Sequence, residues 1–580
     1  MRLKRTKSKN SEHFCIIQDL NVNGKRTTKV YENIGNFDSL CQRAGDMDPF
    51  NWAEKYIATL NSKHKEDTLP VIIKKYENKI IEKNKKSLFN SGYLFLQSIY
   101  YQLGLDSICN DINEKYQYTF DLNNILSQLV YLRVLSPGSK KNAYEQSSSL
   151  LQTKPFELQH TYRCLDVIAK ESDYIQAQLY KNSQKIAKRN SGILYYDCTN
   201  YFFETEEACG IRQYGKSKEN RPSPIVQMGL FLDGDGIPLA FNITPGNTNE
   251  QITLKPLEEK LISDFKHSEF IVCTDAGLSS TTNRKFNNIK NRSFITTQSI
   301  KKLKEFLKIE AIDLTKGWKL EGSTKTYDIS VLGEEVNEEN QDRIDKYKNC
   351  TFYKDRYINE NGLEQRLIVT YSYKYQQYTR KIRNNQVDRA IKMLESGKSK
   401  LTQKKQNDPK RFITKESCTN DGEIAENDIY YINEELIAQE SQYDGLYAVC
   451  TNLEDDVSEI IKINKRRWEI EESFRIMKTE FEARPVYLAR DERIKAHFTT
   501  CFLALVLYRY LEKTLDSSYT VTQIIETLKN MEMLEQREGY MPTYERTDLT
   551  DLLHEKFNFR TDYEIFSYQQ IKKLLQASKR

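Results

Sequence analysis

The chain has 580 residues, of which 38% are hydrophobic and 11% are aromatic. This composition excludes a mostly disordered protein, and the length allows several folded cores. The 87 Lys and Arg residues stand against 82 Asp and Glu residues, which leaves a net charge of only +5. A surface for nucleic acid would therefore come from local clusters of cations and not from a uniformly basic body.

Cysteine usage and hydropathy set the expected compartment. The 11 cysteines are scattered, without a Cys-x-x-Cys pair or a nearby His at zinc spacing, so no structural zinc is expected. Their odd number and a charged first segment without an apolar core fit reduced thiols in a cytoplasm. The longest apolar stretch, 498–511, is too short to span a bilayer. We therefore expect a cytoplasmic protein with no membrane partner.

The predicted elements begin with a β-hairpin, followed by a helical region. Residues 14–34 flank Asn23-Gly24, a pair well suited to a type I′ turn, so 1–85 are interpreted as a hairpin and linker region. Residues 86–189 show helical spacing of apolar residues, broken at Ser136-Pro137-Gly138. Two interpretations of this helical domain stay open, DNA binding and dimerisation, because it has no clear helix-turn-helix pattern.

Strand and turn signals alternate over residues 190–300, with a turn at 233–236, and they predict an α/β unit. Residues 301–455 are polar and charged with strand-like pieces such as 367–373 and 447–451, which predict a separate, β-rich insertion domain.

Two further segments complete the expected organisation. Residues 456–515 predict a second part of the α/β unit, with a long helix near 456–482 and an apolar helix at 494–512. Residues 516–580 predict a C-terminal helical region, which includes a helix at 521–534.

Two aspartates stand at or near the ends of predicted strands. Asp197 follows the apolar run 193–196, where an unpaired carboxylate would be costly to bury. Asp275 follows 270–274 and precedes a turn of small residues, and ligands bind at the carboxyl ends of strands in open α/β sheets. Plainer interpretations are a solvated strand face for Asp197 and a helix N-cap for Asp275.

A third acid, Glu471, stands on a predicted amphipathic helix. At 100° per residue, four polar or basic residues fall within about 40° of it, namely Asn464, Arg467, Arg475 and Lys478. An exposed helix face with ordinary ion pairs explains this pattern too. As a functional site, the acid would hold a metal ion while the cations hold phosphates of one DNA strand. Three such carboxylates can hold two divalent cations against a phosphodiester, which indicates an enzyme that cuts or joins nucleic acid.

With these segments placed, the chain resembles the bacterial insertion-sequence DDE transposases. The resemblance rests on several motifs, which include Tyr196-Asp197-Cys198-Thr199, the stretch 214–222, Gly236-Ile237-Pro238-Leu239, Thr274-Asp275-Ala276-Gly277 and Arg484-Pro485-Val486-Tyr487. The YREK signature of that superfamily, Tyr-x2-Arg-x3-Glu-x6-Lys, matches Arg467, Glu471 and Lys478. Asn464 stands at its Tyr position, where an Asn could reach a phosphate only over a shorter distance.

The resemblance implies an α/β fold, in which an RNase H-like mixed-sheet core is interrupted by a β-rich insertion before the final Glu. The gap between Asp275 and Glu471 holds 471 − 275 − 1 = 195 residues, enough for such a domain. The implied catalytic residues and metal ligands are Asp197, Asp275 and Glu471, sharing two Mg²⁺ ions for which Mn²⁺ can substitute.

The resemblance also implies an activity and partners. A transposase of this kind cleaves the ends of an insertion sequence and joins the 3′-OH ends to target DNA. Its partners are transposon-end DNA with terminal inverted repeats, target DNA and a second copy of the chain, in the cytoplasm and nucleoid of a bacterium. The residues expected to contact DNA are Arg467, Arg475, Lys478, Asn464, Lys216, Lys218 and Arg221. Two alternatives stay open, an RNase H-like nuclease without strand transfer and a catalytically silent, transposase-derived DNA-binding protein.

Three further features carry weaker expectations. The Lys-rich stretch 398–411 either lies along bound DNA or keeps the insertion soluble. His497, within an apolar helix, is interpreted as packed and not catalytic. Trp468, next to the acid's helix face, is interpreted as core-edge packing, with stacking on a flipped base as the alternative.

Overall fold

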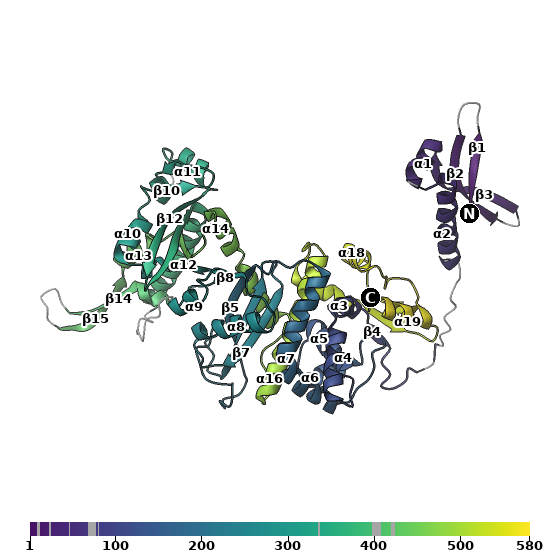
Figure 1. Cartoon of the computed structure of the whole chain (residues 1–580), viewed down its shortest axis with the longest axis horizontal. Coiled ribbons are helices and arrows are strands. Elements are labelled where there is room, and N and C mark those ends of the chain that lie inside the picture. The colour runs from purple at the N-terminus through teal and green to yellow at the C-terminus, as the bar shows by residue number, and fades with distance from the viewer. Residues whose placement is uncertain are drawn as a thin grey trace. The chain divides into compact units, whose positions relative to one another are not determined.

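The computed structural model describes the whole chain except residues 8–11, 23–24, 46, 68–76, 79, 335–336, 397–407 and 419–423 (Figure 1). The chain forms two compact units. The first comprises residues 1–87, 535–541 and 564–569, and the second comprises the remaining residues. Within the described residues, no helix is both long and apolar enough to cross a membrane.

The first unit contains a small antiparallel sheet in the order β1-β2-β3, covered by helices. Its elements are β1 (Arg2–Lys7), β2 (Glu12–Val22), β3 (Lys25–Gly35), α1 (Phe37–Ala44) and α2 (Pro49–Asp67). Phe14 and Ile16, two residues apart on β2, turn the same way and pack with Leu40 of α1 and Ala53 of α2. The predicted hairpin is confirmed as β2 and β3, while its Asn23-Gly24 turn lies outside the described residues.

The second unit begins with the predicted helical region. It contains β4 (Leu88–Asn90), α3 (Tyr93–Gln102), α4 (Leu105–Tyr116), α5 (Leu122–Leu135), α6 (Lys140–Ser147) and α7 (Leu158–Ile186). The predicted break is confirmed, because α5 ends at Leu135 and the Ser139 hydroxyl caps α6 by accepting the N–H of Asn142 at 3.1 Å. These helices belong to the same compact unit as the sheet described below.

The central sheet follows in the chain and begins with consecutive strands, after which helices lie between the strands. Its elements are β5 (Ile193–Phe202), β6 (Ile225–Asp233), β7 (Pro238–Pro245), the 3₁₀ helix η1 (Glu250–Ile252), α8 (Leu254–Ser263), β8 (Phe270–Thr274), α9 (Thr281–Phe286) and β9 (Arg292–Thr297). β5 lies between β6 and β8, antiparallel to the first and parallel to the second. The α/β class and the mixed sheet expected of an RNase H-like core are therefore confirmed.

The inserted segment is mixed, not mainly strand. It contains η2 (Ile300–Lys302), α10 (Glu305–Ile312), β10 (Trp318–Leu320), β11 (Thr326–Tyr327), η3 (Ser330–Gly333), α11 (Gln341–Tyr347), β12 (Thr351–Glu360), β13 (Leu363–Ser372), α12 (Tyr373–Glu395), η4 (Pro409–Phe412), β14 (Ile413–Cys418), β15 (Ile424–Ile432), α13 (Glu434–Ser441) and β16 (Leu446–Thr451). The 23-residue helix α12 alone makes the term β-rich too narrow.

The insertion is also not a separate sheet. Ten strands share one sheet in the order β11-β10-β12-β13-β16-β9-β8-β5-β6-β7, so the strands of the insertion continue the central sheet beyond β9. Only β14 and β15, among the described strands of this segment, form a sheet of their own. The junction is antiparallel, with Val449 of β16 opposite Thr297 of β9.

The long helix expected near 456–482 is two helices, α14 (Val457–Lys465) and α15 (Trp468–Thr479). α14 ends at Lys465, and the N–H of the next residue, Arg466, donates to the carbonyl of Ile463 at 3.1 Å. The break falls within the residues that the sequence pattern placed on one continuous helix. Asn464, Arg467 and Glu471, which stand on both sides of it, still line one cavity.

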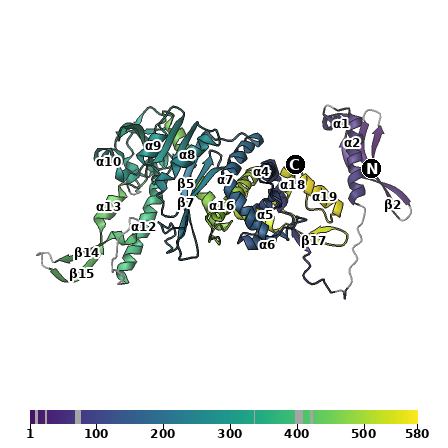
Figure 2. The same ribbon diagram turned by 60° about the horizontal axis from the view of Figure 1, so that its bottom comes forward.

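The remaining elements are α16 (Asp491–Thr514), α17 (Val521–Asn530), β17 (Glu532–Glu535), β18 (Tyr540–Pro542), α18 (Asp548–Phe557) and α19 (Tyr568–Ala577). Most of these residues belong to the second unit, whereas most of β18 and the start of α19 belong to the first. α16 is buried along most of its length and packs against α7, α5 and α3, as Figure 2 shows for α7. The helix expected over 521–534 ends earlier, at Asn530, and β17 replaces its last turn.

Candidate active site

Parallel pairing of β5 and β8 brings Asp197 and Asp275 together. Tyr195 of β5 lies opposite Cys273 of β8, and each aspartate follows two residues later. Side chains two residues apart point to the same side of a strand, and neighbouring strands are about 4.8 Å apart. The hydroxyl of Tyr195 donates to the carbonyl of Ile463 at 2.9 Å, so this side of the sheet faces α14. Both carboxylates are thus placed side by side, facing the helices that lead to Glu471.

Asp197 is partly exposed, and the surroundings of its carboxyl group disfavour the charged form. Burial, with a smaller contribution from the Asp275 charge, raises the pKa of Asp197 from 3.8 to about 6. Lys218, the backbone N–H of Cys198 and Arg467 oppose this rise. The N–H of Cys198 donates to Oδ1 of Asp197 at 2.7 Å. Asp197 is therefore neither fully buried nor freely solvated, and its role as a metal ligand stays a prediction.

Asp275 caps a turn and not a helix. Its Oδ1 accepts the N–H of Leu278 at 3.0 Å, within the turn that follows β8. The next helix, α9, is capped instead by Ser280, whose hydroxyl accepts the N–H of Asn283 at 3.2 Å. The helix N-cap interpretation of Asp275 is therefore wrong, and the carboxylate remains at the end of β8 beside Asp197.

Glu471 lies near this pair through a shared cation, Arg467. An Nη2 atom of Arg467 is 3.5 Å from Oε1 of Glu471, and the charge of Arg467 also acts on Asp197. The Glu471 side chain is 60% exposed. The carboxylate oxygens of Asp197, Asp275 and Glu471 do not all lie within 4.8 Å of one another, as judged over the described residues. The structure therefore brings the two aspartates together and leaves Glu471 turned toward Arg467.

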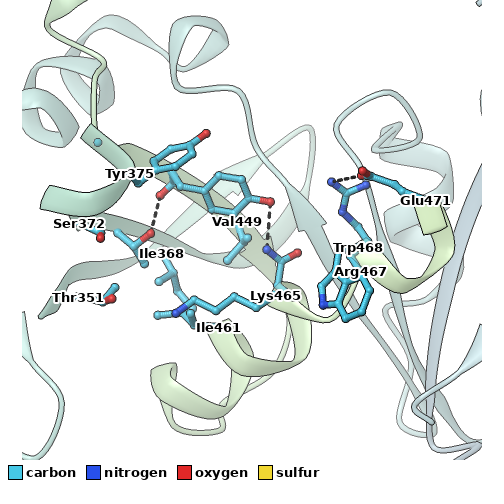
Figure 3. Close-up of a pocket in the computed structure, with 14 residues that line it drawn as sticks. Thr351, Ile368, Ser372, Tyr375, Val449, Ile461, Lys465, Arg467, Trp468 and Glu471 are labelled. Atoms are coloured by element: carbon cyan, nitrogen blue, oxygen red, sulfur yellow. Dashed lines mark hydrogen bonds and ion pairs between the residues drawn. The ribbon is translucent and has the colours of Figure 1, made fainter. Parts of the chain in front are cut away.

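A cavity of about 320 Å³ opens beside Arg467 and Glu471, between the inserted strands and helices α12, α14 and α15 (Figure 3). Asn464 lines it but is only 8% exposed. The Nδ2 atom of Asn464 donates to the hydroxyl of Tyr447 at 3.0 Å, and the hydroxyls of Tyr447 and Thr297 are 2.6 Å apart. The Asn464 side chain is thus bound within the protein, and Tyr447 is a residue of this site that the sequence did not single out.

Trp468 lies at the surface and not at the edge of the core. Its side chain is 56% exposed, and it lines the same cavity as Tyr375 of α12. Figure 3 shows Tyr375 at the opposite side of the cavity from Trp468 and Glu471. The core-edge interpretation of Trp468 is therefore wrong. His497, by contrast, is buried, and its Nε2 atom lies 3.1 Å from the carbonyl of Ala483, which confirms that it is packed.

The basic stretch 214–221 lies next to Asp197. The Lys218 ammonium donates to the carbonyl of Cys198, and its Nζ atom is 3.5 Å from Oε1 of Glu250. Asn200 of β5 fixes the backbone at two points, since its Nδ2 donates to the carbonyl of Lys216 at 3.0 Å and its Oδ1 accepts the N–H of Lys218 at 3.2 Å. The stretch therefore lies beside Asp197, and contact of Lys216, Lys218 and Arg221 with DNA stays a prediction.

The other two cations of α15 point in different directions. Nζ of Lys478 is 3.7 Å from Oε1 of Glu219, whereas Nη2 of Arg475 is 3.5 Å from Oε1 of Glu472. Lys478 is therefore directed toward the basic stretch, and Arg475 is paired on its own helix. Of the Lys-rich stretch 398–411, residues 398–407 lie outside the described residues.

One group of metal-ligand side chains lies elsewhere in the described residues. The ligand atoms of Asp551, His554 and Asp562 lie within 4.8 Å of one another. Nε of Arg546 is 2.6 Å from Oδ1 of Asp551, and Nη2 of Arg560 is 2.6 Å from Oδ2 of Asp562. Arginines already balance both carboxylates, so this group is an ion-pair network.

The protein has an α/β fold in which Asp197 and Asp275 lie side by side on a mixed sheet, with Lys218 and Arg467 near Asp197. Residues 202–507, more than half of the chain, match the family described as "Transposase DDE domain". The chain therefore belongs to this family of transposases. The matched region contains Asp275 and Glu471, and Asp197 lies five residues before it. No curated protein matches the chain.

Solved structures to which this chain shows a weak similarity include other transposases. A piggyBac transposase synaptic complex with hairpin DNA has 7% sequence identity over 84% of each chain, with a TM-score of 0.35. The Mos1 transposase paired-end complex with the left transposon end has 12% identity over 43% of this chain and 68% of that chain, with a TM-score of 0.13. A Mos1 mariner paired-end complex with Mn has 12% identity over 44% and 70%, with a TM-score of 0.14. These values are low, so membership of the family rests on the sequence match.

Proposed function

We propose that the chain is the transposase of a bacterial insertion sequence, of the YREK type, which cleaves the ends of its element and joins the 3′-OH ends to target DNA. One observation carries this proposal. Asp197 and Asp275 lie side by side on parallel strands, with Arg467 beside them, in a chain that matches the DDE domain of transposases.

Asp197, Asp275 and Glu471 would hold two Mg²⁺ ions, with Mn²⁺ as a substitute. The donors fit, because carboxylate oxygens are the ligands these ions prefer, and a carboxyl with a raised pKa beside a second acid favours a nearby positive charge. Bound ions of this kind activate the attacking oxygen and stabilise the leaving 3′ oxygen. Glu471 has to release Arg467 to join them, and its exposed side chain can turn without disturbing the core.

The protein's own residues would hold and orient the DNA strand. Once Glu471 turns away, the Arg467 guanidinium offers its donors to a phosphate next to the scissile bond. Lys218, held by the carbonyl of Cys198, keeps a positive charge beside Asp197. Such placement of the reacting groups accounts for a large share of the rate gain in phosphodiester chemistry.

The partners follow from the reaction. The chain would bind the terminal inverted repeats of its element and then target DNA, within the bacterial cell. Pairing two ends requires two active sites, so a homodimer is the natural assembly. The helical region 86–189 and the residues Arg475, Lys216 and Arg221 remain proposed DNA contacts. Asn464 remains one too, but its amide would have to release the hydroxyl of Tyr447 to reach a phosphate.

The test compares full-length variants on DNA that carries the element's own ends. Asp197→Ala, Asp275→Ala and Glu471→Ala should each abolish Mg²⁺-dependent cleavage and leave end binding, measured by gel shift, largely intact. Glu204→Ala provides the control, because Glu204 is an exposed acid just beyond β5. Any of the three variants that still cuts DNA removes its residue from the metal site.

A second assay separates a transposase from a nuclease. Wild-type protein is given a precleaved end with a free 3′-OH and a supercoiled target plasmid. Joined products support transposition. Cutting of intact ends without joined products would replace the proposal with an RNase H-like nuclease.

A further inference from the structure

One carboxylate, that of Glu219 in the basic stretch, gathers cations from separate parts of the chain. Its Oε1 atom is 3.7 Å from Nζ of Lys478, at the end of α15. Its Oε2 atom pairs with the Arg484 guanidinium and is 3.8 Å from Nε of Arg221. Both oxygens of Glu219 are therefore used, and three positive charges converge on one negative charge.

Two aromatic rings of β5 contact these cations. Lys478 lies over the ring of Tyr201 at 5.5 Å, and Arg484 lies over the ring of Phe202 at 5.6 Å. Arg221 lies over the same Phe202 ring at 4.1 Å. Both rings are buried, and cation–π attraction adds to the ion pairs with Glu219.

The rings that contact this cluster of Glu219, Lys478, Arg484 and Arg221 lie on β5, the strand that also carries Asp197. Tyr201 follows Asp197 by four residues, which is about 13 Å along a strand. At that distance one bound DNA strand can reach both the candidate metal site and the cluster.

The segment that carries Glu219 is fixed by close packing. A Cβ atom at Gly215 would lie 1.9 Å from the carbonyl oxygen of Gly246, so the two backbones touch. Asn200 binds the backbone at Lys216 and Lys218, immediately before Glu219. The backbone immediately before Glu219 is therefore anchored at Gly215, Lys216 and Lys218.

We propose that Glu219 is a positioning residue, which holds Lys478 and Arg484 side by side as a clamp for a phosphate of the bound DNA strand. Arg484 contacts that phosphate directly. Its guanidinium has five N–H donors, enough to serve Glu219 and a phosphate together. The three cations and one carboxylate leave a net positive charge for the DNA. This inference rests on the proposed function, because it requires that the chain binds and cuts DNA.

The proposal predicts the direction in which DNA affinity changes when the negative charge of Glu219 is removed. Removal of a negative charge from a DNA-binding surface should by itself tighten binding. If Glu219 positions the cations, its removal instead lets them repel one another and turn toward solvent, and binding weakens. If Glu219 merely occupies the place of a phosphate, its removal tightens binding.

The experiment uses full-length Glu219→Gln, Glu219→Asp, Arg484→Ala and, as a matched control, Glu207→Gln, an exposed acid in the same connection between β5 and β6. Binding to end DNA is measured by fluorescence anisotropy from 50 to 200 mM KCl, roughly the range over which phosphate contacts respond to salt. Glu219→Gln should weaken binding about tenfold, the loss expected for one charged hydrogen bond. Glu219→Asp should restore part of the loss, and Glu207→Gln should bind as wild type or more tightly.

Arg484→Ala should weaken binding and lower the slope of log affinity against log salt by about one, the value for one lost phosphate contact. This readout does not depend on how the Glu219 variants fold. An unchanged slope for Arg484→Ala, or equal or tighter binding by Glu219→Gln, overturns the clamp. If wild-type protein neither binds nor cuts end DNA, the proposed function itself fails, which is a different result.

Discussion

Divalent-ion binding should weaken as the pH falls through about 6, because a proton then competes for the Asp197 carboxyl group. Burial raises the pKa of this group from 3.8 to about 6, and the neighbouring Asp275 adds to the rise. Above the pKa the carboxylate is ionised and ready to bind, whereas below it the proton must first leave. The ionised fraction falls from roughly nine-tenths at pH 7 to roughly one-tenth at pH 5, which lowers the apparent affinity about tenfold.

An ordinary aspartate would behave differently. With a pKa near its usual value, the same change in pH would alter the affinity by less than about one-tenth. The assay is titration calorimetry of Mn²⁺ into full-length protein without DNA at pH 5, 6 and 7. Asp197→Asn serves as the control, since its amide does not titrate. Equal affinity at pH 5 and pH 7, or full pH dependence in Asp197→Asn, would refute the reasoning.

Other predictions concern the scaffold of the site. Asp233→Ala breaks a fully buried ion pair with Arg189 at 2.6 Å, so it should cost roughly 3–5 kcal/mol and clearly lower the melting temperature; an unchanged melting temperature would contradict this. Gly215→Ala should push the basic stretch away from the backbone at Gly246 and reduce DNA cleavage about tenfold or more, and wild-type cleavage would show that the contact relaxes freely. Trp468→Ala should change stability by less than about 0.5 kcal/mol in thermal denaturation, because the side chain is mostly exposed; a larger loss would restore the core-packing interpretation.

The sequence located the two aspartates because both follow short apolar runs, a local signal. It did not reveal that the runs pair in parallel with Tyr195 opposite Cys273, which is the fact that places the carboxylates together. Strand pairing joins residues far apart in sequence, and composition does not record the register. For the same reason, the sequence did not show that β16 joins β9 and extends the central sheet.

The sequence pattern also failed to predict the break between α14 and α15, because no residue type marks it. The break after α14 falls at Arg466, without a Pro or Gly, so the periodicity appeared continuous through Glu471. Helix α12 was missed because few of its residues are buried, so its apolar residues give no strong helical pattern. The role of Glu219 had no signal, since a single acid within a basic stretch looks like ordinary surface charge.

The continuity of the large sheet limits how this protein can be shortened. Because β16 hydrogen-bonds with β9, a truncation that excised the insertion together with β16 would strip a partner from the flank of the catalytic layer. The bared N–H and C=O groups of β9 would then invite pairing with another molecule, a known route to aggregation. A minimal catalytic fragment must therefore retain β16, or a designed strand in its place, to stay monodisperse in solution.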